Sequence, residues 1–170
     1  MEATMTGYLK VPLLAVVLLA AQVSCAPPPP EVTVATPGEI KARIEASDAP
    51  LVLVHAWATW CVPCIEEFPE LMKVYQNFEA QGLELVLVSG DNPDDPDELK
   101  AVEAFLVNQQ CPVGSLVTTD LSQDFIETLS PNWGGALPAS FFYVDGQLVH
   151  EWEGKRPYQD FAKQIETLLN

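Results

Sequence analysis

The feature that most constrains the fold is an alternation of short, almost wholly apolar runs with longer segments of helical periodicity. Two such runs, 51–58 and 83–89, are too apolar for strands with one face in water, so they predict buried strands. Between them, apolar side chains in 64–81 recur at helical spacing, and Gly82 follows as a helix-ending residue. Buried strands that alternate with helices predict a sheet that is covered on both faces.

The other segments extend this pattern along the domain. Thr36 to Glu39 has the spacing of a capping box, with Pro37 at the first helical position. The pair 145–146 is Asp-Gly between two β-type runs, which is a strong hairpin signal. This order predicts an α/β domain with three layers, α/β/α, and a central mixed sheet. The expected helices are 37–47, 64–81, 99–108, 122–129 and 157–169, and the expected strands are 51–58, 83–89, 113–119, 139–144 and 147–152.

The charge balance excludes whole classes of partner. The 170 residues carry 8 Lys+Arg against 24 Asp+Glu, which gives a formal charge of -16. Contacts to phosphate need clustered basic side chains, and the densest basic cluster here is the pair Lys155 and Arg156. We therefore expect no nucleic-acid partner and little attraction to anionic lipid. The 48% hydrophobic content is enough for a packed core.

The N-terminal segment predicts export. Residues 11–23 are almost entirely apolar, but thirteen residues are too few to cross a bilayer comfortably as a helix. They match the apolar core of a secretory signal. The Ser-Cys pair that ends at Cys25 resembles a bacterial lipobox, which implies a signal peptide at 1–25 and a lipid on Cys25; an ordinary cleaved signal is the alternative. Residues 26–35 contain four consecutive prolines and are expected to form a linker before the folded domain, 36–170.

Two cysteines lie three positions apart where a predicted strand gives way to a predicted helix. Unpaired amides and the helix dipole at a helix N-terminus stabilise an anion, so the pKa of the Cys61 thiol should fall below its free value of about 8.5. The thiolate is the species that attacks a disulfide. Cys64, within one helical turn, can then resolve the mixed disulfide by bonding to Cys61. Pro63 stiffens the loop, and its missing amide hydrogen costs little in a first turn.

The segment Trp57–Glu70 resembles the thioredoxin superfamily, and most closely its extracytoplasmic TlpA-type branch, which includes cytochrome c maturation reductases. A second segment, Ala136–Val149, is similar to the proline-led hairpin of this family, and the resemblance extends over about 36–169. It implies that Pro138 is cis and faces the dithiol, and that Glu67 assists proton transfer at the dithiol as a third catalytic residue. The residues expected to bind substrate are Trp60, Pro63, Leu137 and Pro138.

Two features depart from the family pattern and leave the direction of exchange open. His55 stands six residues before Cys61, where relatives carry Asp or Asn, and Val62 stands where the cytosolic reductants carry Gly. His55 has two interpretations: a proton acceptor on the inner side of Cys64, or a hydrogen-bonded core residue, of which the second is favoured. Glu67 likewise has a second interpretation, as a solvated helix residue.

The remaining cysteine and acidic residues carry weaker signals. Cys111 is expected to be a buried apolar residue rather than a partner in a regulatory or mixed disulfide. The acidic segment 91–97 lacks the spacing of a calcium loop, so we expect it to be solvated. A structural zinc site normally needs four ligands, and too few candidates remain beside Cys61 and Cys64, so we predict no metal site.

These observations predict an exported thiol-disulfide oxidoreductase that reduces disulfides in protein substrates through Cys61 and Cys64. No cofactor is required, because the two sulfurs carry the electrons. The expected partners are a disulfide-containing protein and an upstream membrane thiol donor. We expect a monomer on the periplasmic side of a bacterial cell envelope, attached to the membrane through a lipid at Cys25. The alternatives are a soft-metal module that binds Cu(I) through the same dithiol, and a peroxidase, although peroxide-reducing relatives carry their reactive Cys in a different motif.

Overall fold

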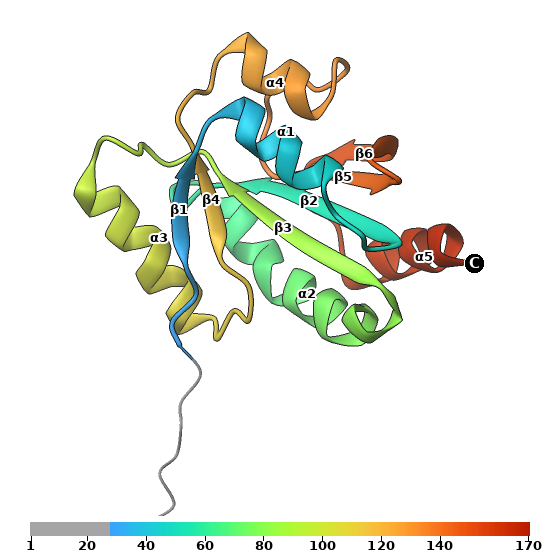
Figure 1. The fold of residues 1–170 in the computed structure, drawn as a ribbon. Coiled ribbons are helices and arrows are strands. Elements are labelled where there is room, and N and C mark those ends of the chain that lie inside the picture. Colours follow the sequence, from blue (N-terminus) through green and yellow to red (C-terminus); the bar gives the residue numbers. More distant parts are fainter. Residues whose placement is uncertain (1–27) are drawn as a thin grey trace, which may run out of the picture.

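A computed structural model describes residues 28–170. The predicted signal peptide, the lipidation site Cys25 and the first part of the linker lie outside the described residues. The described residues form a central sheet with helices on both faces, which confirms the predicted three-layer α/β/α architecture (Figure 1). Along the sheet the strands are β1 (Val32–Ala35), β4 (Ser115–Thr118), β3 (Leu83–Ser89), β2 (Leu51–Trp57), β5 (Ala139–Val144) and β6 (Gln147–Glu153).

The sheet is mixed, as the sequence predicts. The pairs β1–β4, β4–β3 and β3–β2 are parallel, whereas β2–β5 and β5–β6 are antiparallel. The hairpin between β5 and β6 turns at Asp145 and Gly146, which have φ angles of 50° and 71°. Both angles lie in the left-handed region that such tight turns require, so the hairpin prediction is confirmed.

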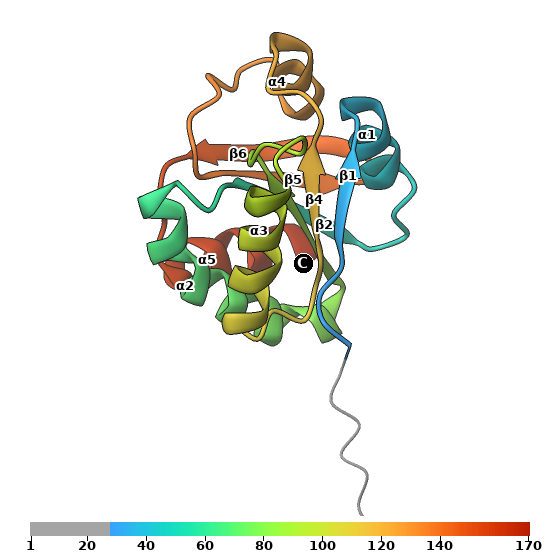
Figure 2. The ribbon, with the colours of Figure 1, turned by 90° about the vertical axis from the view of Figure 1, so that its left-hand side faces the viewer.

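Five helices within residues 28–170 cover the two faces of this sheet unequally. Helices α1 and α4 pack on one face, and α2, α3 and α5 pack on the other (Figure 2). None of the helices in this range has both the length and the apolar character needed to cross a membrane. The helices are α1 (Pro37–Glu45), α2 (Val62–Phe78), α3 (Pro96–Asn108), α4 (Gln123–Leu129) and α5 (Tyr158–Leu169).

Strand β2 lies between the two cores and is buried along its whole length. Leu53 and Trp57 belong to the core that includes Phe68 of α2, whereas Val54 belongs to the core that includes Ile40 of α1. Alternate side chains of a strand point to opposite faces. A strand covered on both faces must therefore be apolar almost throughout, which is why residues 51–58 lack polar alternation.

Strand β1 lies inside the range 26–35, which we expected to be a linker, so that part of the expectation is wrong. It pairs in parallel with β4, from Val32 opposite Ser115 to Ala35 opposite Thr118. The four residues of β1, one residue after a proline run, carry too short a pattern to predict a strand. Pairing with β4 makes this segment part of the sheet, so the folded domain begins before residue 36.

Two helices begin earlier than their apolar periodicity predicts. Helix α2 starts at Val62 rather than at Cys64, because Cys61 is its N-cap. Helix α3 starts at Pro96 rather than at residue 99, because Asp95 is its N-cap and accepts a hydrogen bond from the Asp97 amide. The first turn of a helix is held by capping bonds, so apolar periodicity alone locates its start a few residues late.

The pairing of β1 generates a stability prediction at Gly114. A Cβ atom added there would lie 2.2 Å from the backbone oxygen of Glu31, which accepts a hydrogen bond from the Ser115 amide. The backbone would have to move, so we expect Gly114→Ala to lower the free energy of unfolding by about 1–3 kcal/mol. Gly38→Ala, at an unobstructed position in α1, is the control and should not destabilise the protein. Urea unfolding measures both variants, and equal effects would contradict the close approach of the two segments.

Candidate active site

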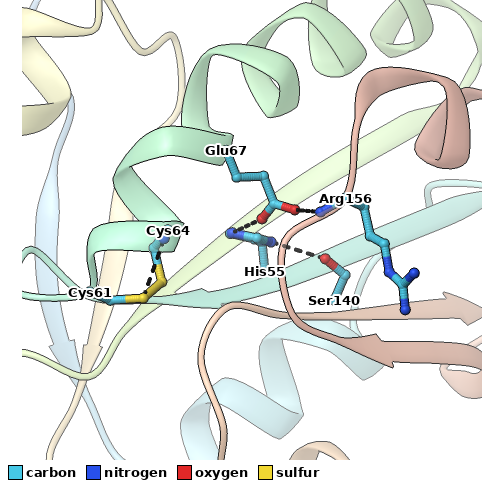
Figure 3. A network of polar contacts seen from close by, with 6 residues as sticks. All are labelled: His55, Cys61, Cys64, Glu67, Ser140 and Arg156. Carbon is cyan, nitrogen blue, oxygen red and sulfur yellow. Dashed lines mark hydrogen bonds and ion pairs between the residues drawn. A yellow bond between two sulfur atoms is a disulfide. The ribbon is translucent and has the colours of Figure 1, made fainter.

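Cys61 and Cys64 form a disulfide where β2 leads into α2 (Figure 3), with 1.99 Å between the sulfurs and 5.3 Å between the Cα atoms. Cys61 is the N-cap of α2, and its Sγ accepts a hydrogen bond from the Cys64 amide at 3.3 Å. Its carbonyl also accepts from the Ile65 amide at 3.1 Å. A helix N-terminus carries partial positive charge, so this position would stabilise a Cys61 thiolate after reduction.

The two cysteines differ in their access to solvent. Cys61 is 6% exposed, whereas Cys64 is completely buried. The apolar side chains on either side, Trp60 and Val62, are 60% and 67% exposed, and Pro63 is also exposed. Of the two cysteines, Cys61 is therefore the one that a partner can reach. This difference suits Cys61 for attack on a partner and Cys64 for the internal step that follows.

The peptide bond between Leu137 and Pro138 is cis, as the family resemblance implies. The next residue, Ala139, pairs with Ala56 near the end of β2. The cis peptide therefore lies at the same end of the strands as the loop that carries Cys61. Pro138 is buried and Leu137 is partly exposed. The fold thus brings both segments that we expect to bind substrate to one end of the sheet.

Asp91 anchors the loop between β2 and α2 to the end of β3. Its carboxylate accepts hydrogen bonds from the Thr59 amide at 3.0 Å, from the Thr59 hydroxyl and from the Ser89 hydroxyl. Asp91 is 1% exposed, so the expectation of a solvated loop over 91–97 is wrong for its first residue. Strands β2 and β3 end side by side, with Trp57 opposite Ser89, and this places Asp91 next to the dithiol loop.

A buried polar cluster lies beside the disulfide, between α2 and the sheet (Figure 3). His55 Nε2 of β2 and Glu67 Oε2 of α2 are 3.4 Å apart, and both side chains are completely buried. His55 Nδ1 lies 3.0 Å from Ser140 Oγ of β5, and Glu67 Oε1 accepts a hydrogen bond from the Arg156 amide. Apart from their mutual contact, His55 Nε2 and Glu67 Oε2 have no partner among the described residues.

Burial determines the protonation of this pair. It lowers the pKa of His55 to about 3, so the imidazole is neutral near physiological pH. Burial also raises the pKa of Glu67 to about 7, against the opposing effects of the Arg156 amide and of the Lys155 and Arg156 charges. Near neutral pH Glu67 is therefore the member of the pair that gains or loses a proton. The alternative that Glu67 is a solvated helix residue is wrong.

Two members of this cluster are absent from the sequence-based expectations. Ser140 follows the cis-proline segment, and only the register of β5 against β2 places it directly opposite His55. The Arg156 amide comes from the segment between β6 and α5, and any residue other than proline could supply it. Neither residue carries a local signal, because each acts through a contact between segments far apart in the chain.

Cys111 is the free cysteine of the described residues and is buried, as expected. Its thiol donates a hydrogen bond to the Val113 carbonyl at 3.2 Å, and burial raises its pKa. Over residues 28–170, no group of three or more His, Cys, Asp or Glu side chains is arranged to hold a metal ion.

The raised pKa of Glu67 links its protonation to folding. The ordinary pKa of this carboxyl is 4.5 and its pKa in the folded protein is about 7, so between these pH values the folded protein holds a proton that the unfolded chain has lost. Stability therefore falls as pH rises through this window. His55 acts in the opposite direction: its pKa falls from 6.5 to about 3 on folding, so its contribution is lost as pH falls below 6.5.

We expect Glu67→Gln to remove the pH dependence of stability that Glu67 causes and to leave that of His55. Relative to the parent, the free energy of unfolding of the variant should rise by about 3 kcal/mol between about pH 4 and pH 8. Urea unfolding of the oxidised proteins at several pH values measures this difference. Glu66→Gln, at an exposed neighbour on α2, controls for the lost charge. If the difference between Glu67→Gln and the parent were the same at every pH, the raised pKa would be contradicted.

The chain is similar to several known proteins. Residues 30–151 match the AhpC/TSA family. The thiol-disulfide oxidoreductase ResA of Bacillus anthracis is 30% identical over 118 residues, which cover 69% of this chain and 62% of that protein. The thiol:disulfide interchange protein HelX of Rhodobacter capsulatus is 30% identical over 124 residues, which cover 72% of this chain and 62% of that protein. The matched region thus spans less than two thirds of the length of these curated relatives.

Solved structures have the same fold. A thiol:disulfide interchange protein of the thioredoxin family from Chlorobium tepidum TLS has a TM-score of 0.60 and 20% identity, and the match covers 76% of this chain and 85% of that one. A thioredoxin-related protein from Neisseria meningitidis serogroup B has a TM-score of 0.60 and 22% identity, with 73% and 88% covered. At these identities the likeness concerns the fold. The chain has a thioredoxin-like fold and belongs to the AhpC/TSA family within the thioredoxin superfamily.

Proposed function

We propose that this protein is a thiol-disulfide oxidoreductase that reduces disulfides in protein substrates through Cys61 and Cys64. One observation carries the proposal: Cys61 caps α2 and keeps some exposure to solvent, whereas Cys64, in the first turn of the helix, is completely buried. The names of the curated relatives, thiol-disulfide oxidoreductase and thiol:disulfide interchange protein, support the same activity.

The reaction follows from the different positions of the two sulfurs. In the reduced protein, the Cys61 thiolate attacks one sulfur of the substrate disulfide, and the other substrate sulfur leaves as a thiolate and takes up a proton. Cys64 then loses its proton and attacks Cys61 Sγ, which releases the second substrate thiol and forms the Cys61–Cys64 disulfide. Two electrons pass to the substrate, and its two sulfurs each take up a proton. No cofactor takes part, because the electrons move between sulfur atoms.

Glu67 is the proposed acceptor of the proton that leaves Cys64. The Cys64 side chain is completely buried, so its thiol has no direct contact with solvent. Glu67 lies three residues further along α2, on the same side of the helix, and is buried as well. A carboxyl group whose pKa is about 7 can both accept and return a proton near neutral pH.

The substrate is proposed to bind at the end of the sheet where the dithiol loop and the cis peptide meet. The exposed side chains of Trp60 and Pro63 lie on one of these segments, and Leu137 and Pro138 lie on the other. An extended substrate segment can form backbone hydrogen bonds beside Pro138, in the manner of an added strand. The formal charge of -16 favours neutral or basic partner surfaces over acidic ones.

The catalytic cycle requires an electron donor, because each turnover leaves the protein oxidised. We propose a membrane thiol donor and an exported, monomeric protein on the periplasmic side of a bacterial envelope. The apolar segment 11–23 supports export, and the Ser-Cys pair that ends at Cys25 supports lipid attachment. The segment 26–31 would then separate the lipid from β1.

Serine substitution of each cysteine tests the proposed order of attack. Cys61→Ser should abolish reduction of a disulfide-containing protein, because the attacking thiolate is lost. Cys64→Ser should instead accumulate a mixed disulfide between Cys61 and the substrate, because the resolving thiol is lost. Cys111→Ser is the matched control and should retain activity, since that buried cysteine is outside the reaction. Mass spectrometry identifies the adduct, and an adduct on Cys64 in Cys61→Ser would contradict the assignment.

The reduction potential of the Cys61–Cys64 pair decides the direction of exchange. We expect one reversible two-electron transition in a dithiothreitol buffer series, near the value of about -270 mV that is typical of thioredoxin. A value of about -120 mV, as in a strong oxidant such as DsbA, would instead identify the protein as an oxidant and overturn the reductase assignment. If no reversible transition occurred, copper titration of the reduced protein would test the alternative of a soft-metal module.

A further inference from the structure

The contact between His55 and Glu67 contains two buried polar atoms that have no other partner. His55 Nε2 and Glu67 Oε2 face each other at 3.4 Å (Figure 3), and neither forms another hydrogen bond within the described residues. A buried polar atom without a partner costs about 1–3 kcal/mol. Two such atoms that face each other can be satisfied together by one hydrogen between them.

The contacts on the far sides of both groups determine where that hydrogen lies. Ser140 Oγ stands 3.0 Å from His55 Nδ1, so an Nδ1–H group can donate to it and leave Nε2 as an acceptor. Glu67 Oε1 already accepts a hydrogen bond from the Arg156 amide, so it is not the oxygen that carries the acid hydrogen. A hydrogen on Glu67 Oε2 would therefore be donated to His55 Nε2 and would satisfy both atoms.

The charged side chains that act on the His55–Glu67 pair lie on one side of it. Lys155 and Arg156, in the segment between β6 and α5, both favour the ionised form of Glu67. Lys155 also pairs with Glu66 of α2, which is exposed. On the sheet side, β2 supplies His55 and β5 supplies Ser140, neither of which carries a charge near neutral pH. The protonated and ionised forms of Glu67 are thus both accessible near neutral pH.

We propose that His55 is a positioning residue for the proton that Glu67 exchanges with Cys64, and that its imidazole holds this proton on Glu67 Oε2, between the two buried groups. This inference rests on the proposed function. When an incoming dithiol reduces the Cys61–Cys64 disulfide, two electrons enter the disulfide and the donor becomes a disulfide. The Cys64 sulfur leaves as a thiolate and takes the proton from Glu67, which is protonated again from solvent. In the opposite direction Cys64 returns its proton to Glu67 as it attacks Cys61.

Two substitutions of His55 separate its two contacts. The amide of Asn reaches the position of Nδ1, so His55→Asn keeps a partner for Ser140 but removes the acceptor that faces Glu67. The longer side chain of His55→Gln places an amide near the Nε2 position and should restore an acceptor. His150→Asn is the matched control, because His150 lies on β6 and packs against the rings of Phe142 and Trp152 rather than in the cluster around Glu67.

The first readout is the titration of the pair in the oxidised protein, without any substrate. The ¹³C signal of the Glu67 carboxyl and the ¹⁵N signal of His55 Nε2 should change with the same midpoint. In His55→Asn the Glu67 midpoint should move to lower pH by about one unit, because the lost acceptor stabilises only the protonated carboxyl. His55→Gln should recover part of this shift, and His150→Asn should not move the midpoint. Different midpoints for the two signals in the parent protein, or an unmoved Glu67 midpoint in His55→Asn, would overturn the proposal.

The second readout is the rate at which dithiothreitol reduces the disulfide, as a function of pH. The profile of the parent protein should have an inflection at the Glu67 midpoint, and His55→Asn should shift it together with that midpoint. Glu67→Gln should lose the inflection and react about 100-fold more slowly at neutral pH. An inflection that stayed in place in His55→Asn would overturn the role of His55 and leave the proposed reductase intact. Failure to reduce any protein disulfide would instead reject the proposed function, and the titration would still report on the pair.

Discussion

Strand β2 is covered on both faces, so every polar group that it carries must find its partner inside the protein. The imidazole of His55 meets this requirement at Nδ1, which lies 3.0 Å from Ser140 Oγ, and its Nε2 faces Glu67 Oε2 at 3.4 Å. The backbone oxygen of Trp57, at the end of the strand, accepts a hydrogen bond from the Gly90 amide at 2.9 Å. These contacts hold the strand against both neighbours at the point where the chain enters the dithiol loop. The position of Cys61 at the start of α2 depends on this fixed strand end.

The same junction places the two sulfurs in different environments. Cys61 caps the helix, where amide groups and the helix dipole favour a thiolate. Cys64 lies inside the first turn, away from water, where an ionised thiol would lose its solvation. A buried thiol of this kind can react only if a nearby group takes its proton. Glu67, buried one helical turn further along α2, is the group that we propose for this step, and its raised pKa follows from the same lack of solvent.

The residue at position 55 changes the electrostatics of this buried region. A carboxyl group there would face Glu67, and two acids so close together could not both be ionised without a large cost. The neutral imidazole of His55 avoids that repulsion and, in the proposed pair, accepts a hydrogen bond from protonated Glu67. The buried region then contains one acid, Glu67, and the positive charges of Lys155 and Arg156 stabilise its ionised form. This arrangement explains how the chain can depart from the family pattern at His55 and still keep an ionisable carboxyl beside the dithiol.

The sequence by itself determined the three-layer fold and the dithiol at a strand-to-helix junction. These features have local causes: apolar runs, helical spacing, the Asp-Gly turn and the cysteine spacing are all properties of neighbouring residues. Only the tertiary structure decided that β1 joins the sheet, that Asp91 holds Thr59, and that Ser140 and the Arg156 amide complete the cluster around His55 and Glu67. Each of these contacts joins segments that are separated along the chain. Strand register and helix packing create such contacts, and no local pattern of residues encodes them.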